Sequence, residues 1–280
     1  MKLFPDSTLS FDENVQNSEG ILPLLLGRNE ISQLVISDLT RIRSLLVVGG
    51  ENTSRSKFLQ TLILSTILKT KPDALQLILI GSDVQSFSAF RGCRHLSQSI
   101  ETDPKAAIET LTSVIAEMER RYQLLSDLGV SHIDEYNLQL ANLSRGSVDK
   151  VRKPLPRVLI AIDELENLME ADREITEKFA DIMNHHASST GLYLVLATQY
   201  AECSVVTGII KAVFSSKIAF KLNERKDSLW ILDQSGAEKL SADREMLFLS
   251  PEVTSLQKLR GFEISDAGVA KLIKNAWRID

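Results

Sequence analysis

The sequence has few cysteines, no long apolar run and no signal-peptide pattern. Its two cysteines, Cys93 and Cys203, form neither a disulfide pattern nor a metal motif, which is typical of reduced thiols in the cytosol. No apolar run approaches the ~20 residues that a bilayer-spanning helix needs. The N-terminus also lacks the layout of a secretory leader. We therefore expect a soluble, cytoplasmic protein with no membrane partner.

The net charge gives no general indication of a nucleic-acid partner. It is −5 at pH 7, so no global basic field surrounds the chain. Duplex DNA is not excluded, because a ring can bind it through a few residues that line a pore. Hydrophobic residues make up 44% of the chain, which is enough for one sizeable core.

Short apolar runs alternate with stretches of helical periodicity from Ile21 onward. Residues 1–20 are polar and predict an irregular N-terminal lead-in, whereas residues 21–280 are expected to form one domain. Strands alternating with helices over this length indicate an α/β fold with a mainly parallel central sheet flanked by helices. Strands are predicted at 45–48, 75–80, 158–162, 192–196 and 214–222, and helices at 57–69, from 104 onward and at 174–187.

The turn after the first of these strands carries part of a phosphate-loop pattern. That loop requires G-x-x-x-x-G-K-[ST], in which glycines let backbone N–H groups surround phosphate, lysine reaches the β- and γ-phosphates, and the hydroxyl holds Mg²⁺. Gly49 and Ser56 fit the first and last positions, whereas Ser54 replaces the second glycine and Arg55 replaces the lysine. An ordinary βα turn is the alternative interpretation. The candidate nucleotide-binding residues are Gly49, Gly50, Asn52, Thr53, Ser54, Arg55 and Ser56.

These substitutions impair the predicted loop. A Cβ at Ser54 strains or narrows a cradle that needs glycine-like dihedral angles. Arg55 keeps the positive charge, but its planar fork does not mimic an ammonium group. Glu51 adds an anion beside the phosphate site. We expect ATP with Mg²⁺ to bind weakly and ATP hydrolysis to be weak or lost.

Two carboxylates follow the strand at 158–162. In a P-loop ATPase, Asp163 would support the Mg²⁺ shell together with Ser56, and Glu164 would orient and activate water. Gln199 ends the next strand, where it is placed to sense the γ-phosphate or to position water. Asp163, Glu164 and Gln199 are therefore the candidate catalytic residues. The alternative explanation for Asp163 and Glu164 is that they begin a helix, where the helix dipole favours acidic residues.

Further motifs occur in the same order as in a known family. They run collinearly from about residue 24 to about residue 273, and they are Leu26-Gly27-Arg28-Asn29, Met118-Glu119-Arg120-Arg121-Tyr122, Gly129-Val130, Tyr136-Asn137, Leu194-Val195-Leu196-Ala197-Thr198-Gln199, Thr207-Gly208-Ile209-Ile210-Lys211, Ile231-Leu232-Asp233-Gln234, Gly236-Ala237-Glu238 and Arg260-Gly261-Phe262. This series resembles the FtsK/SpoIIIE family of hexameric, ATP-driven double-stranded DNA translocases. The resemblance implies a RecA-like P-loop NTPase fold. It also implies a homo- or hetero-oligomeric ring with nucleotide at subunit interfaces and DNA threaded through the centre.

The chain departs from the family pattern mainly at charged residues. The family loop is close to G-T-T-G-S-G-K-S, so two glycines and the lysine are lost here. The family has an arginine at the positions of Ser188 and Leu229, and an Arg-Pro pair at Tyr200-Ala201. An arginine that stabilises phosphate charge is worth about 10³ to 10⁵ in rate. Gly81-Ser82-Asp83 also replaces Asp-Pro-Lys, and residues 242–245 replace a glycine-rich segment.

Three functional hypotheses remain open. The first is a ring-forming motor module that binds nucleotide and DNA with low ATPase activity. The second is a pseudo-ATPase that serves as an assembly subunit, mixed into rings with an intact homologue. The third is a coupling component in protein secretion or conjugation. The resemblance covers the motor core alone, so we expect no α-domain, no winged-helix domain and no membrane anchor. His95 is expected to be structural, and His185-His186 is not expected to bind a metal.

Overall fold

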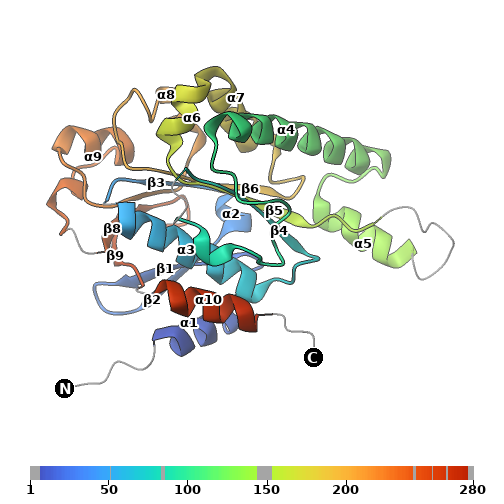
Figure 1. The fold of residues 1–280 in the computed structure, drawn as a ribbon, viewed down its shortest axis with the longest axis horizontal. Coiled ribbons are helices and arrows are strands. Elements are labelled where there is room, and N and C mark those ends of the chain that lie inside the picture. The colour runs from blue at the N-terminus through green and yellow to red at the C-terminus, as the bar shows by residue number, and fades with distance from the viewer. Residues whose placement is uncertain are drawn as a thin grey trace.

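The chain folds around one sheet that has a layer of helices on each face (Figure 1). The structure is a computed structural model that describes residues 7–50, 52–82, 86–143, 153–241, 244–253, 255–262 and 264–276. Glu51, Asp83 and residues 242–243, which entered the sequence argument, lie outside the described residues. Among the helices that are described, none has both the length and the apolar character needed to cross a bilayer.

The parallel part of the sheet has the strands that the sequence predicts. The strands of the described residues are β1 (Pro23–Asn29), β2 (Leu34–Asp38), β3 (Ser44–Val48), β4 (Leu75–Ile80), β5 (Arg157–Ile162), β6 (Leu192–Thr198), β7 (Lys217–Ala219), β8 (Glu245–Leu249) and β9 (Gln257–Arg260). The first three predicted strands match β3, β4 and β5 to within one residue, and β6 extends two residues beyond its prediction. Strands β7, β3, β6, β5 and β4 lie side by side in this order and are parallel, so the predicted α/β fold is confirmed.

The fifth predicted strand is shorter than expected. The sequence predicts a strand at 214–222, but β7 covers only Lys217–Ala219. Phe214 ends the preceding helix, and the partner strand β3 ends at Val48, which pairs with Ala219. The pairing of β7 with β3 therefore ends at Ala219.

Four antiparallel strands extend the sheet beyond β7. The order of the whole nine-stranded sheet, as far as the chain is described, is β2-β1-β9-β8-β7-β3-β6-β5-β4. Gly27 allows β1 and β9 to approach closely, because a Cβ at its φ of +155° would lie 2.3 Å from the carbonyl oxygen of Arg260. The sequence argument did not predict this extension.

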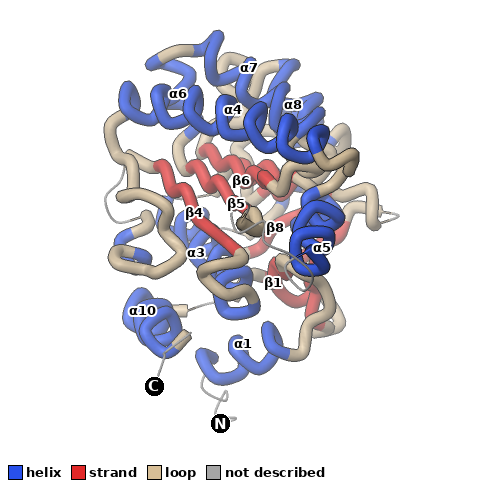
Figure 2. Tube along the Cα trace, turned by 90° about the vertical axis from the view of Figure 1, so that its right-hand side faces the viewer, coloured by secondary structure: helices blue, strands red, loops and turns tan. Residues whose placement is uncertain are grey.

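One layer of helices covers the upper face of the sheet (Figures 1 and 2). It contains α4 (Pro104–Asp127), α6 (Leu165–Ala171), α7 (Arg173–His186) and α8 (Gly208–Val213), with α9 (Arg225–Leu232) beside them. The start of α4 is confirmed: Asp103 caps the helix by accepting hydrogen bonds from the amides of Lys105 and Ala106, and Pro104 occupies the first turn. Shorter or peripheral elements are α2 (Leu39–Ile42), α5 (Ile133–Leu143) and the 3₁₀ turns η1 (Ser88–Phe90) and η2 (Ala237–Lys239).

The lower face is covered by α3, α10 and α1 (Figure 2). These helices span Asn52–Lys69, Asp266–Asn275 and Ser7–Gln16. Helix α1 corrects the prediction that residues 1–20 are irregular. Phe11 and Val15 are fully buried one helical turn apart, and the Phe11 ring contacts that of Phe262 edge-on with centroids 5.4 Å apart. This apolar pair orders a segment whose other residues are mostly polar.

Candidate functional site

The predicted site residues gather at the carboxyl ends of three neighbouring strands. β6 lies between β3 and β5, so the turns after these strands meet at one edge of the sheet. Gly49 follows β3, Asp163 follows β5 and Gln199 follows β6. Ligands of open parallel sheets bind at this edge. The topology therefore brings together the three segments that the sequence argument connected.

The turn after β3 directs its first amides toward the protein. Gly49 and Gly50 have positive φ angles of 80° and 77°. The Gly49 amide donates to the Thr198 carbonyl at 3.0 Å, and the Gly50 amide donates to the Lys221 carbonyl at 3.3 Å. A Cβ on Gly49 would lie 2.5 Å from the Leu222 side chain. The turn is thus held close to the chain after β7, and these two N–H groups are not directed at a phosphate.

The candidate loop residues from Asn52 to Ser56 lie inside a helix. Helix α3 begins at Asn52, five residues earlier than the sequence predicts. The backbone of Asn52, Thr53 and Ser54 therefore forms the first turn of α3 and not a loop around phosphate; the Asn52 and Thr53 side chains lie outside the described residues. This start of α3 directs the side chains of Arg55 and Ser56 toward the end of β5.

Arg55 forms a buried ion pair with Asp163. Its Nε donates to Asp163 Oδ1 at 2.9 Å, and the two side chains are 1% and 0% exposed. The residue at the lysine position of the loop therefore contacts the strand-end aspartate directly. A charge-assisted hydrogen bond in such a dry site is strong, and losing either partner leaves an uncompensated charge.

Two serine hydroxyls also contact Asp163. Ser56 Oγ donates to Asp163 Oδ2 at 2.8 Å, and Ser86 Oγ donates to the same oxygen at 3.0 Å. Ser56 and Asp163, the two predicted metal-associated residues, are thus in direct contact. Ser86 was not predicted as a site residue, since it follows the altered Gly81-Ser82-Asp83 segment and belongs to no motif; the hydrogen bond from Gln60 Nε2 to its carbonyl oxygen positions it.

Glu164 contacts the end of β4 and the first turn of α6. It has left-handed backbone angles (φ 65°, ψ 60°), which cost a non-glycine residue about 1–2 kcal/mol. Its carboxylate accepts hydrogen bonds from Ser82 Oγ and, at 3.3 Å, from Asn167 Nδ2. The cavity that reaches Asp163 and Glu164 has a volume of only about 10 Å³, enough for about one water molecule.

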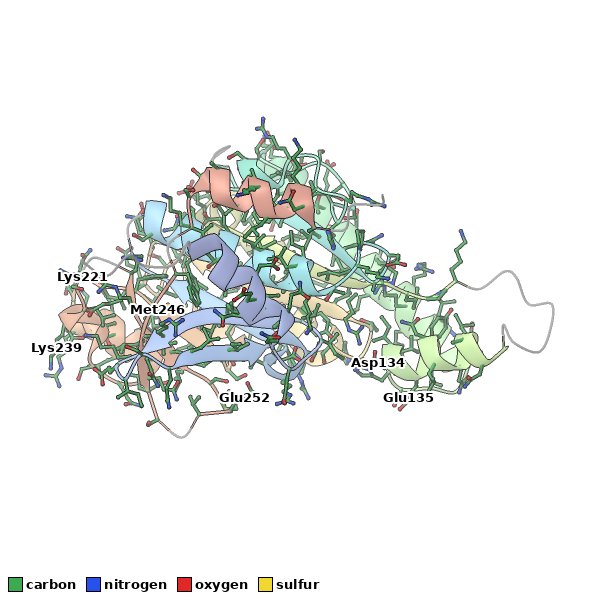
Figure 3. All side chains as sticks on the ribbon, turned by 90° about the horizontal axis from the view of Figure 1, so that it is seen from below. Asp134, Glu135, Lys221, Lys239, Met246 and Glu252 are labelled. Carbon is green, nitrogen blue, oxygen red and sulfur yellow. The ribbon has the colours of Figure 1, made fainter. Side chains whose placement is uncertain are left out.

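Gln199 lies on a different, open cleft. This cleft has a volume of about 330 Å³ and is lined by Gly49, Gly50, Gln199, Tyr200, Ala201, Glu202, Lys221, Leu222, Asn223 and Asp227. Lys221, on the chain after β7, lies at the end of the molecule opposite Asp134 and Glu135 of α5 (Figure 3). The glycines and Gln199 therefore line a space of ligand size, whereas Arg55, Ser56 and Asp163 form a closed network beside it.

A further carboxylate, Glu166, belongs to this edge and was missed. Its Oε2 accepts a hydrogen bond from Thr198 Oγ1 at 2.7 Å. Burial raises the pKa of Glu166 above its usual value, while the Thr198 hydroxyl and the positive charge of Arg55 act in the opposite direction. The sequence signal was a third acid two residues after Glu164, which the motif argument did not use.

A family model matches residues 9–203 of the chain, and its description is FtsK/SpoIIIE family. The chain belongs to the FtsK/SpoIIIE family. It is 34% identical over 251 residues to the DNA translocase SpoIIIE of Bacillus subtilis, which covers 89% of this chain and 31% of that protein. It is 37% identical over 224 residues to the DNA translocase FtsK of Tropheryma whipplei, covering 80% of this chain and 30% of that protein. The chain spans about a third of the length of these curated relatives.

Solved structures of P-loop ATPases have the same fold. The cytoplasmic domain of the Type VII secretion ATPase EccC from Thermomonospora curvata superposes with a TM-score of 0.78 and 17% identity, over 94% of this chain and 32% of that one. The conjugation coupling protein TcpA superposes with a TM-score of 0.76 and 19% identity, over 94% of this chain and 72% of that one. The predicted P-loop ATPase fold is therefore confirmed.

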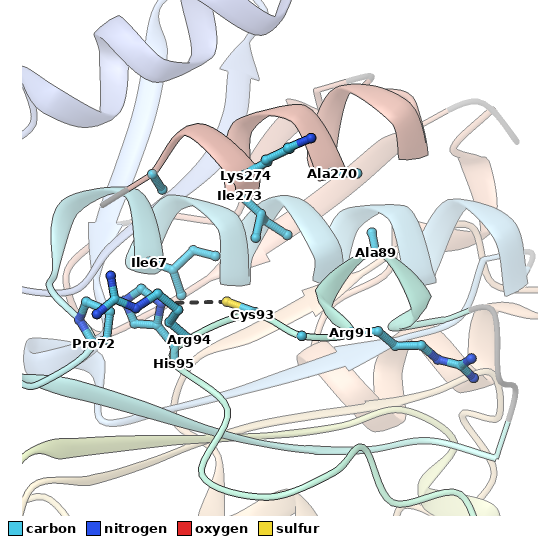
Figure 4. Close-up of a pocket in the computed structure, with 12 residues that line it drawn as sticks. Ile67, Pro72, Ala89, Arg91, Cys93, Arg94, His95, Ala270, Ile273 and Lys274 are labelled. Atoms are coloured by element: carbon cyan, nitrogen blue, oxygen red, sulfur yellow. Dashed lines mark hydrogen bonds between the residues drawn. The ribbon is translucent and has the colours of Figure 1, made fainter. Parts of the chain in front are cut away.

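A third cavity of this FtsK/SpoIIIE-type chain lies away from the site, between α3, α10 and the loop after η1 (Figure 4). Its volume is about 540 Å³, and no predicted catalytic residue lines it. His95 is buried in its wall, with Nε2 2.7 Å from the Thr70 carbonyl and Nδ1 3.6 Å from Cys93 Sγ. These contacts support the structural role expected for His95.

We expect His95 to make the fold sensitive to mild acid. Burial lowers the pKa of His95 below its usual value of 6.5, and the nearby Arg94 charge acts in the same direction. The unfolded chain therefore takes up a proton that the folded chain resists, so stability is lost as the pH falls through about 6.5. Thermal unfolding from about pH 7.5 to about pH 5.5 should show a smaller loss of Tm for His95→Gln than for the wild type. Equal losses would contradict the assignment.

Proposed function

We propose that this chain is an FtsK/SpoIIIE-type motor module that associates with nucleotide and duplex DNA in a ring but hydrolyses ATP slowly or not at all. The buried Arg55–Asp163 ion pair carries the proposal. The cation at the lysine position is held by the aspartate that would otherwise face the metal ion of a nucleotide. Mg·ATP must break this pair before Arg55 can reach its phosphates or Asp163 its metal ion, which weakens binding and hydrolysis together.

The position of Glu164 gives independent support. A water-activating carboxylate needs space for the water and for the γ-phosphate that the water attacks. In this structure the Glu164 carboxylate instead accepts hydrogen bonds from Ser82 and Asn167, which hold it toward the end of β4 and α6. The DNA assignment is supported by the relatives that are named DNA translocases, and the ring assignment by the family resemblance of the motifs; both are part of the same proposal.

Measuring ATP hydrolysis with and without duplex DNA tests the proposal. We expect turnover well below the roughly 1–10³ s⁻¹ that is usual for enzymes. Glu164→Gln should change this residual rate little, and Glu170→Gln, an exposed acid on the same helix, is the matched control. Fluorescence anisotropy with labelled duplex should show binding that weakens as salt rises. Turnover in the usual range that Glu164→Gln abolishes would disprove the impaired-motor proposal.

An assembly subunit is the second candidate. Tyr200 and Leu229 occupy positions where the family has arginine, and each is 44% exposed. Apolar groups at these positions suit contact with another subunit better than stabilisation of phosphate charge. Mass photometry of the chain mixed with an intact FtsK/SpoIIIE translocase should then detect mixed rings. In a variant of this second candidate, the chain is a coupling component of secretion or conjugation that engages protein and not DNA. The absence of duplex binding in the anisotropy measurement would favour this variant.

A further inference from the structure

The oxygen atoms of Asp163 are fully used by hydrogen-bond donors of the protein. Oδ1 accepts from Arg55 Nε at 2.9 Å and from the Glu164 amide at 3.1 Å. Oδ2 accepts from Ser56 Oγ at 2.8 Å and from Ser86 Oγ at 3.0 Å. An ionised carboxylate has about four lone-pair positions. These four donors fill them, so no position is left for a metal ion or for a water molecule of its shell.

The positive charge that neutralises Asp163 is also supplied by the protein itself. The Arg55 guanidinium is fully buried against Asp163, and its field reaches Glu166. Glu166 also feels the charge of Glu164, so the positive charge of Arg55 acts on two carboxylates of this edge, Asp163 and Glu166. A divalent ion placed at Asp163 would meet a guanidinium 2.9 Å from the oxygen that it needs. Mg²⁺, which gives up its water reluctantly, does not fit this arrangement.

We propose that Arg55 is the resident cation of this site and that the site takes no divalent metal ion. The inference rests on the proposed function, because it concerns the same nucleotide site, but its test requires no nucleotide. Arg55 then has a function of its own in this site, and its presence is more than the loss of the family's lysine. The fold keeps its acidic strand end neutralised at every Mg²⁺ concentration.

Removing the guanidinium should recreate the need for a metal. In Arg55→Met a flexible apolar side chain occupies much of the arginine volume without its charge. Asp163 then keeps the Glu164 amide at Oδ1, and the nearby Ser56 and Ser86 hydroxyls supply oxygen atoms that suit a hard cation. A divalent ion that binds the folded variant and not the unfolded chain will raise its Tm.

Thermal unfolding of the full chain in EDTA and in millimolar MgCl₂ or MnCl₂ tests this inference. We expect the wild-type Tm to differ by less than about 1 °C between these conditions, and the Arg55→Met Tm to be lower in EDTA and to rise by about 5 °C with metal. Arg121→Met is the matched control, since it also removes a buried arginine, whose partners are Glu117 and the carbonyls of Pro156 and Thr190. Its Tm should fall without recovering in metal.

Electron paramagnetic resonance of Mn²⁺ measures metal binding directly, and it is also used if Arg55→Met does not fold. The milder Arg55→Gln, which also removes the positive charge, then replaces Arg55→Met, and the wild type and Asp163→Asn are compared in the same measurement. Wild-type protein that binds Mn²⁺ or gains Tm with Mg²⁺, and loses this with Asp163→Asn, overturns the inference. A folded Arg55 variant that gains neither binding nor Tm overturns it as well. ATP hydrolysis enters neither readout, so failure here is distinct from failure of the proposed function.

Discussion

Replacing Arg55 with methionine is expected to lower the free energy of unfolding, measured in metal-free buffer, by about 3–5 kcal/mol. The reason is the burial of its partner: Asp163 is 2% exposed and would keep its negative charge without a counterion. Methionine fills space but gives the carboxylate no donor, so the loss exceeds that of an ordinary core substitution. Urea unfolding followed by circular dichroism measures the difference.

A double-mutant cycle separates the ion pair from packing. Asp163→Asn alone leaves a buried guanidinium without its charge partner, whereas Arg55→Met with Asp163→Asn removes both charges. We expect a favourable coupling energy of up to about 3 kcal/mol for residues in direct contact. Arg120→Met is the control, because Arg120 is half exposed and its pair with Glu117 should be worth less than about 1 kcal/mol. A cost at Arg55 as small as that at Arg120 would contradict the buried-pair description.

The sequence predicted the parallel half of the fold because its signals are local. Apolar runs such as 158–162 are buried on both faces, and the Asp103-Pro104 start is a capping pattern that acts within one turn. The antiparallel strands β8, β9, β1 and β2 could not be predicted in the same way. Their pairing depends on long-range contacts such as that of Gly27 with Arg260. Helix α1 likewise depends on a partner, Phe262, that is remote in sequence.

The sequence predicted which residues would meet at the edge of the sheet but not their contacts. Spacing and strand ends identified Arg55, Ser56 and Asp163, and the structure brings these three together. The motif could not show that Arg55 would turn inward onto Asp163, since that depends on where α3 begins. It also could not separate Gln199, which lines the open cleft, from the closed network around Asp163. Whether the predicted residues bind nucleotide and catalyse hydrolysis stays a prediction.

Restoring the loop with Asn52→Gly, Ser54→Gly and Arg55→Lys is expected to increase ATP affinity at least about 10-fold and to make it dependent on Mg²⁺. The two glycines weaken the first turn of α3 by up to about 1 kcal/mol each, which favours a loop whose amides can face phosphate. Lysine replaces the planar fork by a single ammonium that can leave Asp163 for the phosphates. Binding of a fluorescent ATP analogue in Mg²⁺ and in EDTA measures both effects.

Partial variants identify which feature closes the site. The glycine pair without Arg55→Lys should lower Tm yet leave ATP affinity almost unchanged, because the Arg55–Asp163 pair stays in place. Arg55→Lys alone should release Asp163 but keep the helical first turn at Asn52, so only part of the gain is expected. If the triple variant binds ATP no better than the wild type, the closed network is not the obstacle. Tyr200 and Leu229, where the family has arginine, would then be the next residues to restore. The comparison thus separates a site blocked by its own cation from a site that has lost its phosphate contacts.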